Sequence, residues 1–199
     1  MRSRVIAALL FVVIVGAAGG CTSDDDPDAG HSPGPTGTTS TATSAATSTT
    51  SDVPVVDPAS GEQAVLGESL SLRLPSQGDW YLDDSGGSIF ATATVDGVTV
   101  DIGGSDVLSD VDALDEGASL ALDVLDDQPG MTYRRGDDIT VAGKVCWVID
   151  GESAGKRFKE VGTLHNGRIV HFDFTIRAPD EPAFAKDLIA SVIASVEWM

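Results

Sequence analysis

The feature that most constrains the fold is a run of Thr and Ser near the start of the chain, at residues 36–51. Apart from Ala and a single Gly, this run holds only Thr and Ser. Such a segment has no apolar surface to bury and cannot offset the entropy of ordering its backbone. We therefore expect residues 21–52 to form a disordered tether. The chain then divides into an apolar start at 1–20, this tether, and one domain at 53–199.

The apolar start has the pattern of a secretory signal peptide. Arg2 and Arg4 form a basic beginning, and an apolar run follows at 5–18. This run lies within the usual range of a signal-peptide core and is shorter than the roughly 20 residues that a membrane-spanning helix needs. The sequence therefore predicts an exported protein from which residues 1–20 are removed.

The segment Ala18-Gly19-Gly20-Cys21 resembles the lipobox of bacterial lipoproteins. In that family the cysteine thiol receives a diacylglycerol, and the signal peptide is cut just before it. Two acyl chains, such as palmitate, are enough for stable anchoring. The resemblance implies lipidation at Cys21 and a mature protein held on the cell membrane, facing outside the cytoplasm, without a transmembrane helix. The alternative is an uncleaved signal anchor, because Ala18 stands where Leu is more common.

Charge and cysteine content exclude several classes of function. The formal net charge of -19 at pH 7 repels nucleic acid, so we expect no nucleic-acid partner. Cys146 lies in the apolar run 145–148, and we expect a buried, inert thiol there. No zinc spacing is present, and the bases available to a nucleophile are few: His31 in the tether, His165 at a hairpin tip and His171. We predict no catalytic residue, no cofactor and no metal.

Hydrophobic periodicity predicts an α+β domain. Alternation with period two indicates strands, and apolar residues three and four apart indicate helices. The expected strands lie at 69–74, 81–83, 88–95, 98–102, 145–150, 158–164 and 169–177. The expected helices are 109–127, capped by Ser109 or Asp110, and a C-terminal one that opens at Asp180-Glu181-Pro182. This order favours a mainly antiparallel sheet packed between helices.

Two dipeptides predict tight hairpin turns, because they readily take positive φ angles: Asp96-Gly97 and Asn166-Gly167. The second turn also fixes a register. Its facing pairs are His165–Arg168, Leu164–Ile169, Gly162–His171 and Glu160–Asp173. In this register one side of the last strand faces the core, through Val170, Phe172, Phe174 and Ile176.

The same register brings Glu160, His171 and Asp173 together on the other face of the sheet. Two acids directly opposite each other are unfavourable, so we expect a positive group beside them: Arg157, Arg177 or a cation. The simpler interpretation is a polar sheet face neutralised by arginine. The alternative is a weak metal site, because one His and two carboxylates are adequate ligands.

Several short segments resemble the PsbP-like fold. They are Leu72-Arg73-Leu74-Pro75 with Gly78-Asp79-Trp80 at the entry, Ala142-Gly143, the turn region 166–170, and the closing segment 193–198 that ends in Trp. The LpqN/LpqT-type lipoproteins of actinobacteria are the most similar in pattern. The resemblance covers residues 66–199. It implies an antiparallel sheet between helices, an exported location, an interaction role and no catalytic set.

We therefore expect an acidic binding or interaction module at the cell envelope. The alternative is a carrier of a lipid or another apolar ligand, held in a cavity between helix and sheet that Phe172, Phe174 and Phe184 would line. An enzyme is not expected; it would need a site at Glu160, His171 and Asp173, and a pocket elsewhere would count against it. The sequence leaves open the ligand or partner, glycosylation of the tether, an apolar cavity and the oligomeric state.

Overall fold

The computed structural model describes residues 56–199. The predicted signal peptide at 1–20, the lipidation site Cys21, the tether at 21–52 and the first residues of the predicted domain, from Val53, lie outside the described residues. Within 56–199, no helix is both long and apolar enough to cross a membrane.

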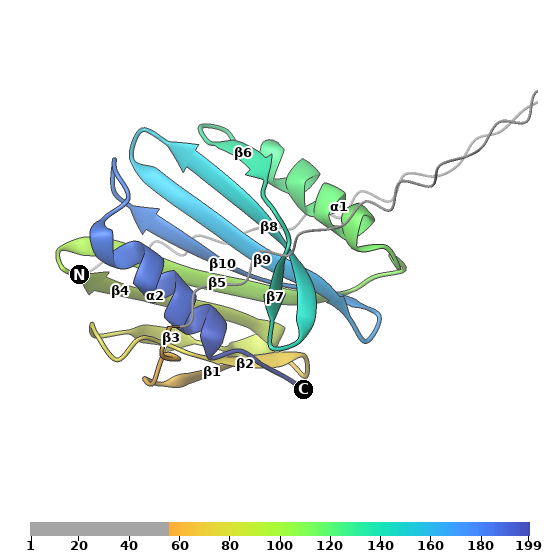
Figure 1. Ribbon diagram of the computed structural model, residues 1–199, viewed down its shortest axis with the longest axis horizontal. Helices are drawn as coiled ribbons and strands as arrows, with labels where there is room; N and C mark the ends of the chain where they lie inside the picture. Colours follow the sequence, from red (N-terminus) through yellow and green to blue (C-terminus); the bar gives the residue numbers. More distant parts are fainter. Residues whose placement is uncertain (1–55) are drawn as a thin grey trace, which may run out of the picture. The chain divides into compact units, whose positions relative to one another are not determined.

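The described part contains two antiparallel sheets and two α-helices (Figure 1). The large sheet has the strand order β3-β4-β5-β10-β9-β8-β6, with β7 also paired to β8, and the small sheet has the order β1-β2-β11. The elements are β1 Gln63–Leu66, β2 Leu70–Arg73, β3 Tyr81–Asp83, β4 Ser88–Val95, β5 Val98–Leu108, α1 Leu114–Asp126, β6 Thr132–Arg135, β7 Ile139–Val141, β8 Lys144–Ser153, β9 Lys156–His165, β10 Arg168–Arg177, α2 Ala183–Ala194 and β11 Glu197–Trp198, with a short 3₁₀ turn at Ser85–Gly87. The predicted α+β class is confirmed.

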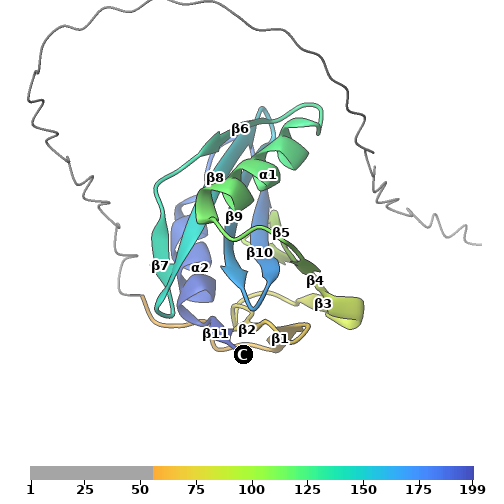
Figure 2. The ribbon, with the colours of Figure 1, turned by 90° about the vertical axis from the view of Figure 1, so that its right-hand side faces the viewer.

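The large sheet carries a hydrophobic core on each face. Strand β8 shows this best, because its successive side chains point to opposite faces. Cys146 and Val148 pack into the larger core, with α2 and the small sheet. Trp147 and Ile149 pack into a smaller core, with α1 and β6. The two helices therefore cover opposite faces of the sheet, as predicted, and Figures 1 and 2 show them on different sides of its strands.

Both predicted hairpin turns are confirmed. Asp96 and Gly97 have φ angles of 50° and 80°, and Asn166 and Gly167 have φ angles of 51° and 72°. The β9–β10 register is the predicted one at all four facing pairs. The core side of β10 is almost completely buried, since Val170, Phe172, Phe174 and Ile176 are each about 1% exposed.

The predicted helix starts are wrong. Helix α1 begins at Leu114, and its N-cap is Ala113 without a side-chain cap. Ser109 is occupied elsewhere: its amide donates to Gly167 O at 3.0 Å and its hydroxyl accepts from the Val111 amide at 3.1 Å. These bonds hold the chain beside the β9–β10 hairpin, so it cannot yet turn into a helix.

The C-terminal helix differs at both ends from the prediction. Pro182, rather than Asp180, is its N-cap, because residues 180–182 are not helical. The helix ends at Ala194, and Trp198 lies on strand β11 instead. There the Trp198 indole donates to Val141 O at 2.9 Å, which fixes the end of the described chain to β7.

Strand β5 extends to Leu108, well beyond the predicted end at residue 102, because β10 pairs with it along its whole length. Strands β1, β6 and β7 were not expected from the sequence; they are short and lie at sheet edges.

Cys146 is a free, fully buried thiol, as predicted. Burial raises the pKa of Cys146 to about 12, so this side chain is not a thiolate near neutral pH and is chemically inert.

Candidate functional site

The face of the large sheet that carries α1 is only partly covered. Helix α1 packs on β6, β8 and β9. It does not cover β3, β4, β5 or most of β10. Strand pairing and side-chain alternation place one set of residues on this uncovered part. We call it the open face; it includes Tyr81, Phe90, Thr94, Ser105, Val107, His171 and Asp173, and also Asp83, Ser88, Thr92, Asp101 and Arg177.

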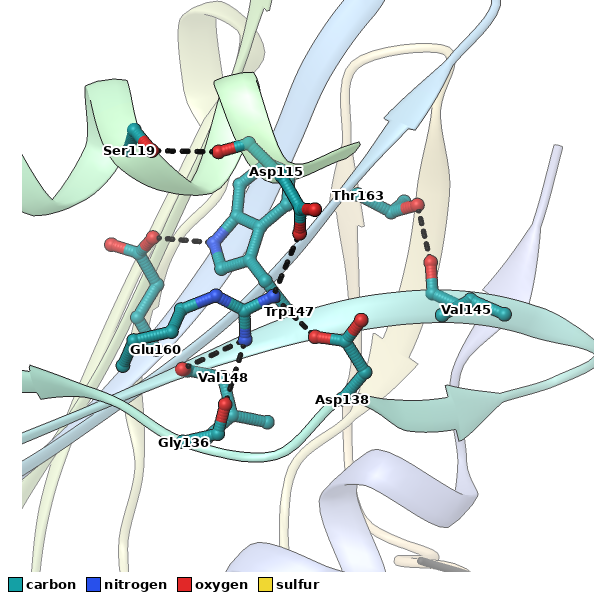
Figure 3. Close-up of polar contacts among 10 residues, drawn as sticks. Asp115, Ser119, Gly136, Asp138, Val145, Trp147, Val148, Glu160 and Thr163 are labelled. Atoms are coloured by element: carbon teal, nitrogen blue, oxygen red, sulfur yellow. Dashed lines mark hydrogen bonds and ion pairs between the residues drawn. The ribbon is translucent and has the colours of Figure 1, made fainter. Parts of the chain in front are cut away.

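Glu160 lies at the boundary between the open face and the core beneath α1. Only 3% of this residue is exposed, and both of its carboxylate oxygens have partners. The Trp147 indole donates to Oε1 at 3.1 Å, as Figure 3 shows, and His171 Nδ1 lies 3.5 Å from Oε2. The predicted closeness of Glu160 and His171 is therefore confirmed.

His171 connects this buried acid to a serine that the sequence reasoning missed. Its Nε2 atom lies 2.6 Å from Ser105 Oγ, on the neighbouring strand β5. Four side chains thus form one row across β8, β9, β10 and β5: Trp147, Glu160, His171 and Ser105. Ser105 and His171 are 66 residues apart, and no short-range pattern in the sequence signals that β5 pairs with β10.

Asp173, the third member of the predicted cluster, sits over a glycine. A Cβ atom at Gly103 would lie 2.6 Å from Asp173 Oδ2, so the glycine leaves room for the carboxylate in its present position. The pKa of Asp173 is raised to about 6, chiefly by burial; His171 lowers it, and the charges of Glu160 and Asp101 raise it. For His171, burial lowers the pKa, but the hydrogen bond and charge of Glu160, with the charge of Asp173, outweigh burial and leave the pKa raised.

Neither Arg157 nor Arg177 bonds to Glu160 or Asp173, although Arg177 does pair with an acid on the same sheet face. Arg177 forms two bonds to Asp101 Oδ2, at 2.9 and 2.7 Å. Arg157 donates to the backbone carbonyls of Ser153, Lys156 and Pro179. The basic side chain nearest these acids is the His171 imidazole.

Among residues 56–199, no group of three or more His, Cys, Asp or Glu side chains has an arrangement that could hold a metal ion. The metal alternative for Glu160, His171 and Asp173 therefore has no support from their geometry.

Apolar side chains surround Ser105 on the open face. Phe90 is 48% exposed and Val107 is 51% exposed, and Tyr81 on β3 is 60% exposed. Val107 follows Ser105 by two positions on the same strand, and Phe90 follows by two positions the residue that faces Ser105 on β4. Exposed aromatic and branched side chains gathered around polar groups are typical of an interaction surface.

A second polar group fastens α1 beside this face. The Arg135 guanidinium donates to Gly136 O at 2.9 Å and to Val148 O, and it pairs with Asp138 and, at 3.9 Å, with Asp115 of α1 (Figure 3). These contacts join β6, β8 and the start of α1. Arg135 therefore has a structural role in placing the helix that borders the open face.

The deeper hollows lie on the opposite side of the sheet, next to α2. One, of about 230 Å³, is lined by Arg134, Asp150, Glu152, Lys159, Phe174, Ile189 and neighbouring residues. Another, of about 360 Å³, contains Phe184 and the segment 56–60. Phe174 and Phe184 thus belong to separate hollows, and Phe172 is enclosed in the core. The single apolar cavity expected for a carrier is not formed by these three residues.

Two segments have the spacing Gly-x-Ser-x-Gly of a nucleophile elbow, which the sequence reasoning overlooked. They are Gly30-His31-Ser32-Pro33-Gly34, outside the described residues, and Gly151-Glu152-Ser153-Ala154-Gly155. The second spans the end of strand β8 and the turn to β9, whereas an elbow needs a strand followed by a helix. It therefore does not identify Ser153 as a nucleophile.

No protein-family model matches this sequence, and no curated protein matches it either. Three solved structures are similar to the fold. Cyanobacterial PsbP (CyanoP) from Synechocystis sp. PCC 6803 has 15% identity and a TM-score of 0.48, with 73% of this chain and 96% of that protein covered. LpqN of Mycobacterium tuberculosis, described as involved in cell envelope biogenesis, has 18% identity and a TM-score of 0.40, with 65% and 82% covered.

The third is a protein from Bacteroides thetaiotaomicron VPI-5482, with 14% identity and a TM-score of 0.34, covering 68% of this chain and 49% of that protein. PsbP and LpqN are also the two groups that the sequence segments resemble. A shared fold does not by itself assign an activity.

Proposed function

We propose that this chain is a lipid-anchored protein outside the cytoplasm, whose open face binds another protein of the cell envelope. The observation that carries the binding role is the set of half-exposed side chains on the open face: Tyr81, Phe90 and Val107. The lipobox-like segment ending at Cys21 and the tether at 21–52 support the anchored location. On this proposal the tether holds the domain away from the membrane surface.

The chemistry of the open face favours a partner with apolar and basic groups. Next to its apolar side chains lie the carboxylates of Asp83 and Asp173. Arg177 lies on the same face, but its guanidinium is paired with Asp101, and the whole chain carries a formal charge of -19. A basic partner is attracted by this field, whereas acidic proteins and nucleic acid are repelled.

The anchoring part of the proposal is tested by replacing Cys21 with Ser in the native host. We expect the variant to lose the mass of the diacylglyceryl group and to leave the membrane fraction, or to accumulate with residues 1–20 uncleaved. Processing and membrane retention identical to those of the parent, with no lipid mass on the parent, would contradict lipidation.

The binding part is tested by photo-crosslinking on intact cells. A photoreactive amino acid at Thr94, on the open face, should give a protein adduct that disappears when Phe90→Ser is added. The matched control places the same probe at Leu120, which is exposed on α1. Adducts of equal yield from both positions, or adducts that are insensitive to Phe90→Ser, would contradict the proposal. Co-purified lipid without a protein adduct would favour the carrier instead.

A further inference from the structure

Ser105, His171 and Glu160 have the arrangement of an activated serine. The Ser105 Oγ to His171 Nε2 distance is 2.6 Å, and the His171 Nδ1 to Glu160 Oε2 distance is 3.5 Å. A hydroxyl is a weak nucleophile on its own and becomes reactive when a neighbouring base accepts its proton, with a third group orienting that base. Hydrogen bonds within such groups are often long before a substrate binds.

We propose that Ser105 is a covalent acyl-acceptor site, with His171 as the base and Glu160 as the positioning residue. This goes beyond the proposed binding function, because it assigns a reaction to one atom of the open face. Each side chain comes from a different strand, β5, β10 and β9, so the sheet register itself holds the three in line.

Glu160 determines which nitrogen of His171 carries the proton. Its oxygen Oε2 lies 3.5 Å from Nδ1 and favours a proton on that nitrogen, which leaves the Nε2 lone pair directed at the Ser105 hydroxyl. Glu160 cannot turn away easily, because Trp147 Nε1 binds its other oxygen and the residue is 3% exposed. Trp147 and His171 already supply partners for both oxygens of this buried acid, and Ser105 contacts only the histidine.

The surroundings of Ser105 favour an apolar acyl group. The serine is partly exposed, and the side chains flanking it on the open face are Phe90 and Val107. These two residues can contact an alkyl chain while its carbonyl carbon lies over the hydroxyl. The donor class is an activated acyl compound, that is, a thioester or an aryl ester.

The reaction is a simple acyl transfer. Ser105 Oγ attacks the carbonyl carbon while His171 Nε2 takes the hydroxyl proton. A new C–O bond forms, the bond from the acyl carbon to the thiol or phenol breaks, and His171 returns the proton to that leaving group. The products are an ester on Ser105 and the free thiol or phenol, and no oxidant or reductant is needed.

The position of Ser105 favours a stable adduct over rapid turnover. Strand β5 pairs with β4 on one side and β10 on the other at Ser105, so its backbone N–H groups are used in the sheet. In serine enzymes, free backbone amides that donate hydrogen bonds to the oxyanion contribute a large part of the rate enhancement, and β5 has no such free amides at Ser105. Without oxyanion stabilisation, an activated donor still acylates Ser105, whereas hydrolysis of the resulting alkyl ester is much slower. The acylated serine therefore accumulates.

The test uses the full chain in mild detergent with p-nitrophenyl esters. We expect one equivalent of nitrophenol, a mass increase of one acyl group, and the label on the peptide that contains Ser105. Ser105→Ala should remove the label. The control is Ser88→Ala; Ser88 faces Ser105 across β4 and β5 but has no histidine bonded to it, so labelling should be unchanged.

Two further variants separate a reactive role from a structural one. His171→Gln should slow acylation about 100-fold or more, the usual loss when a general base is removed. Glu160→Gln should slow it less and should also shift the pH midpoint of the reaction downwards, because the anion that raises the pKa of His171 is gone. Octanoyl ester should react faster than acetyl ester, and Phe90→Ser should reduce that preference.

Labelling that persists in Ser105→Ala, or that maps to lysines or to Ser88, would overturn the proposal. A pH profile identical in parent and Glu160→Gln would also contradict it. Circular dichroism and the melting temperature of each variant show whether the fold is kept. If His171→Gln or Glu160→Gln unfolds, the Ser105→Ala and Ser88→Ala pair still decides the question, because both exchange one small side chain for another.

Discussion

At the scale of single residues, Trp147 organises the side of the sheet beneath α1. Its indole is fully buried, binds Glu160, and lies flat over Gly162 on the neighbouring strand. Gly117 of α1 approaches the same ring, and a Cβ there would lie 3.1 Å from it. Gly117 lowers the intrinsic stability of the helix, but it allows α1 to pack on the indole.

Gly162→Ala tests this packing. The added Cβ would lie 2.3 Å from the Trp147 ring, so the indole must move and its bond to Glu160 must weaken. We expect a loss of roughly 3 kcal/mol in the free energy of unfolding, measured by urea denaturation, at the upper end of the usual range for overpacking. Gly155→Ala is the control, because nothing lies within 4 Å of a Cβ there. Equal stability of both variants would show that the indole is not confined.

Asp173 makes the stability of the fold depend on pH. Its folded pKa of about 6 lies above the ordinary value of 3.8, so between these values the folded state binds more protons than the unfolded state. Stability therefore falls as pH rises from about 4 to 7. Asp173→Asn should leave stability near pH 4 unchanged and raise it at pH 7, by up to about 3 kcal/mol.

Urea denaturation of parent and Asp173→Asn at both pH values isolates this contribution, since the other acids are the same in the two chains. His171 acts in the same direction: its raised folded pKa gives stability at low pH that is lost as the imidazole deprotonates. A variant that is less stable than the parent at pH 7 would contradict the argument.

At the scale of elements, α1 has its own small core, separate from the one under α2. Leu125 is 6% exposed within it, whereas Val124 is 61% exposed on the outer side of the same helix. Leu125→Ala should lower the free energy of unfolding by about 2–3 kcal/mol, and Val124→Ala should change it by less than about 0.5 kcal/mol. Denaturation curves measure both. Similar losses at the two positions would mean that α1 is not docked as described.

The elements also show what the sequence could and could not predict. The β9–β10 register followed from Asn166-Gly167, because a two-residue turn fixes pairing locally, and it correctly brought Glu160 close to His171. Ser105 could not be found this way, because β5 and β10 are distant in the sequence and pair only through tertiary structure. For the same reason the start of α1 was misplaced: Ser109 is bonded to the hairpin at Gly167.

At the scale of the whole molecule, the excess of acidic groups works against compactness. The chain has 31 Asp and Glu against 12 Lys and Arg. Self-repulsion of this charge destabilises the folded state, and salt screens it. Raising NaCl from 20 mM to 500 mM should increase the melting temperature by a few degrees, where about 1 kcal/mol corresponds to 2–4 °C for a domain of this size. A decrease would indicate that ion pairs such as Arg177–Asp101 dominate instead.

Strand β2 lies between β1 and β11, so the small sheet joins an early strand of the described chain to its last strand. Leu70 pairs with Trp198, and at synthesis rates of about 5–20 residues per second the interval between them takes on the order of ten seconds. During that time one backbone edge of β2 has no partner strand. A newly made chain therefore stays open to chaperones until the last residues of the described part are synthesised and the small sheet can close.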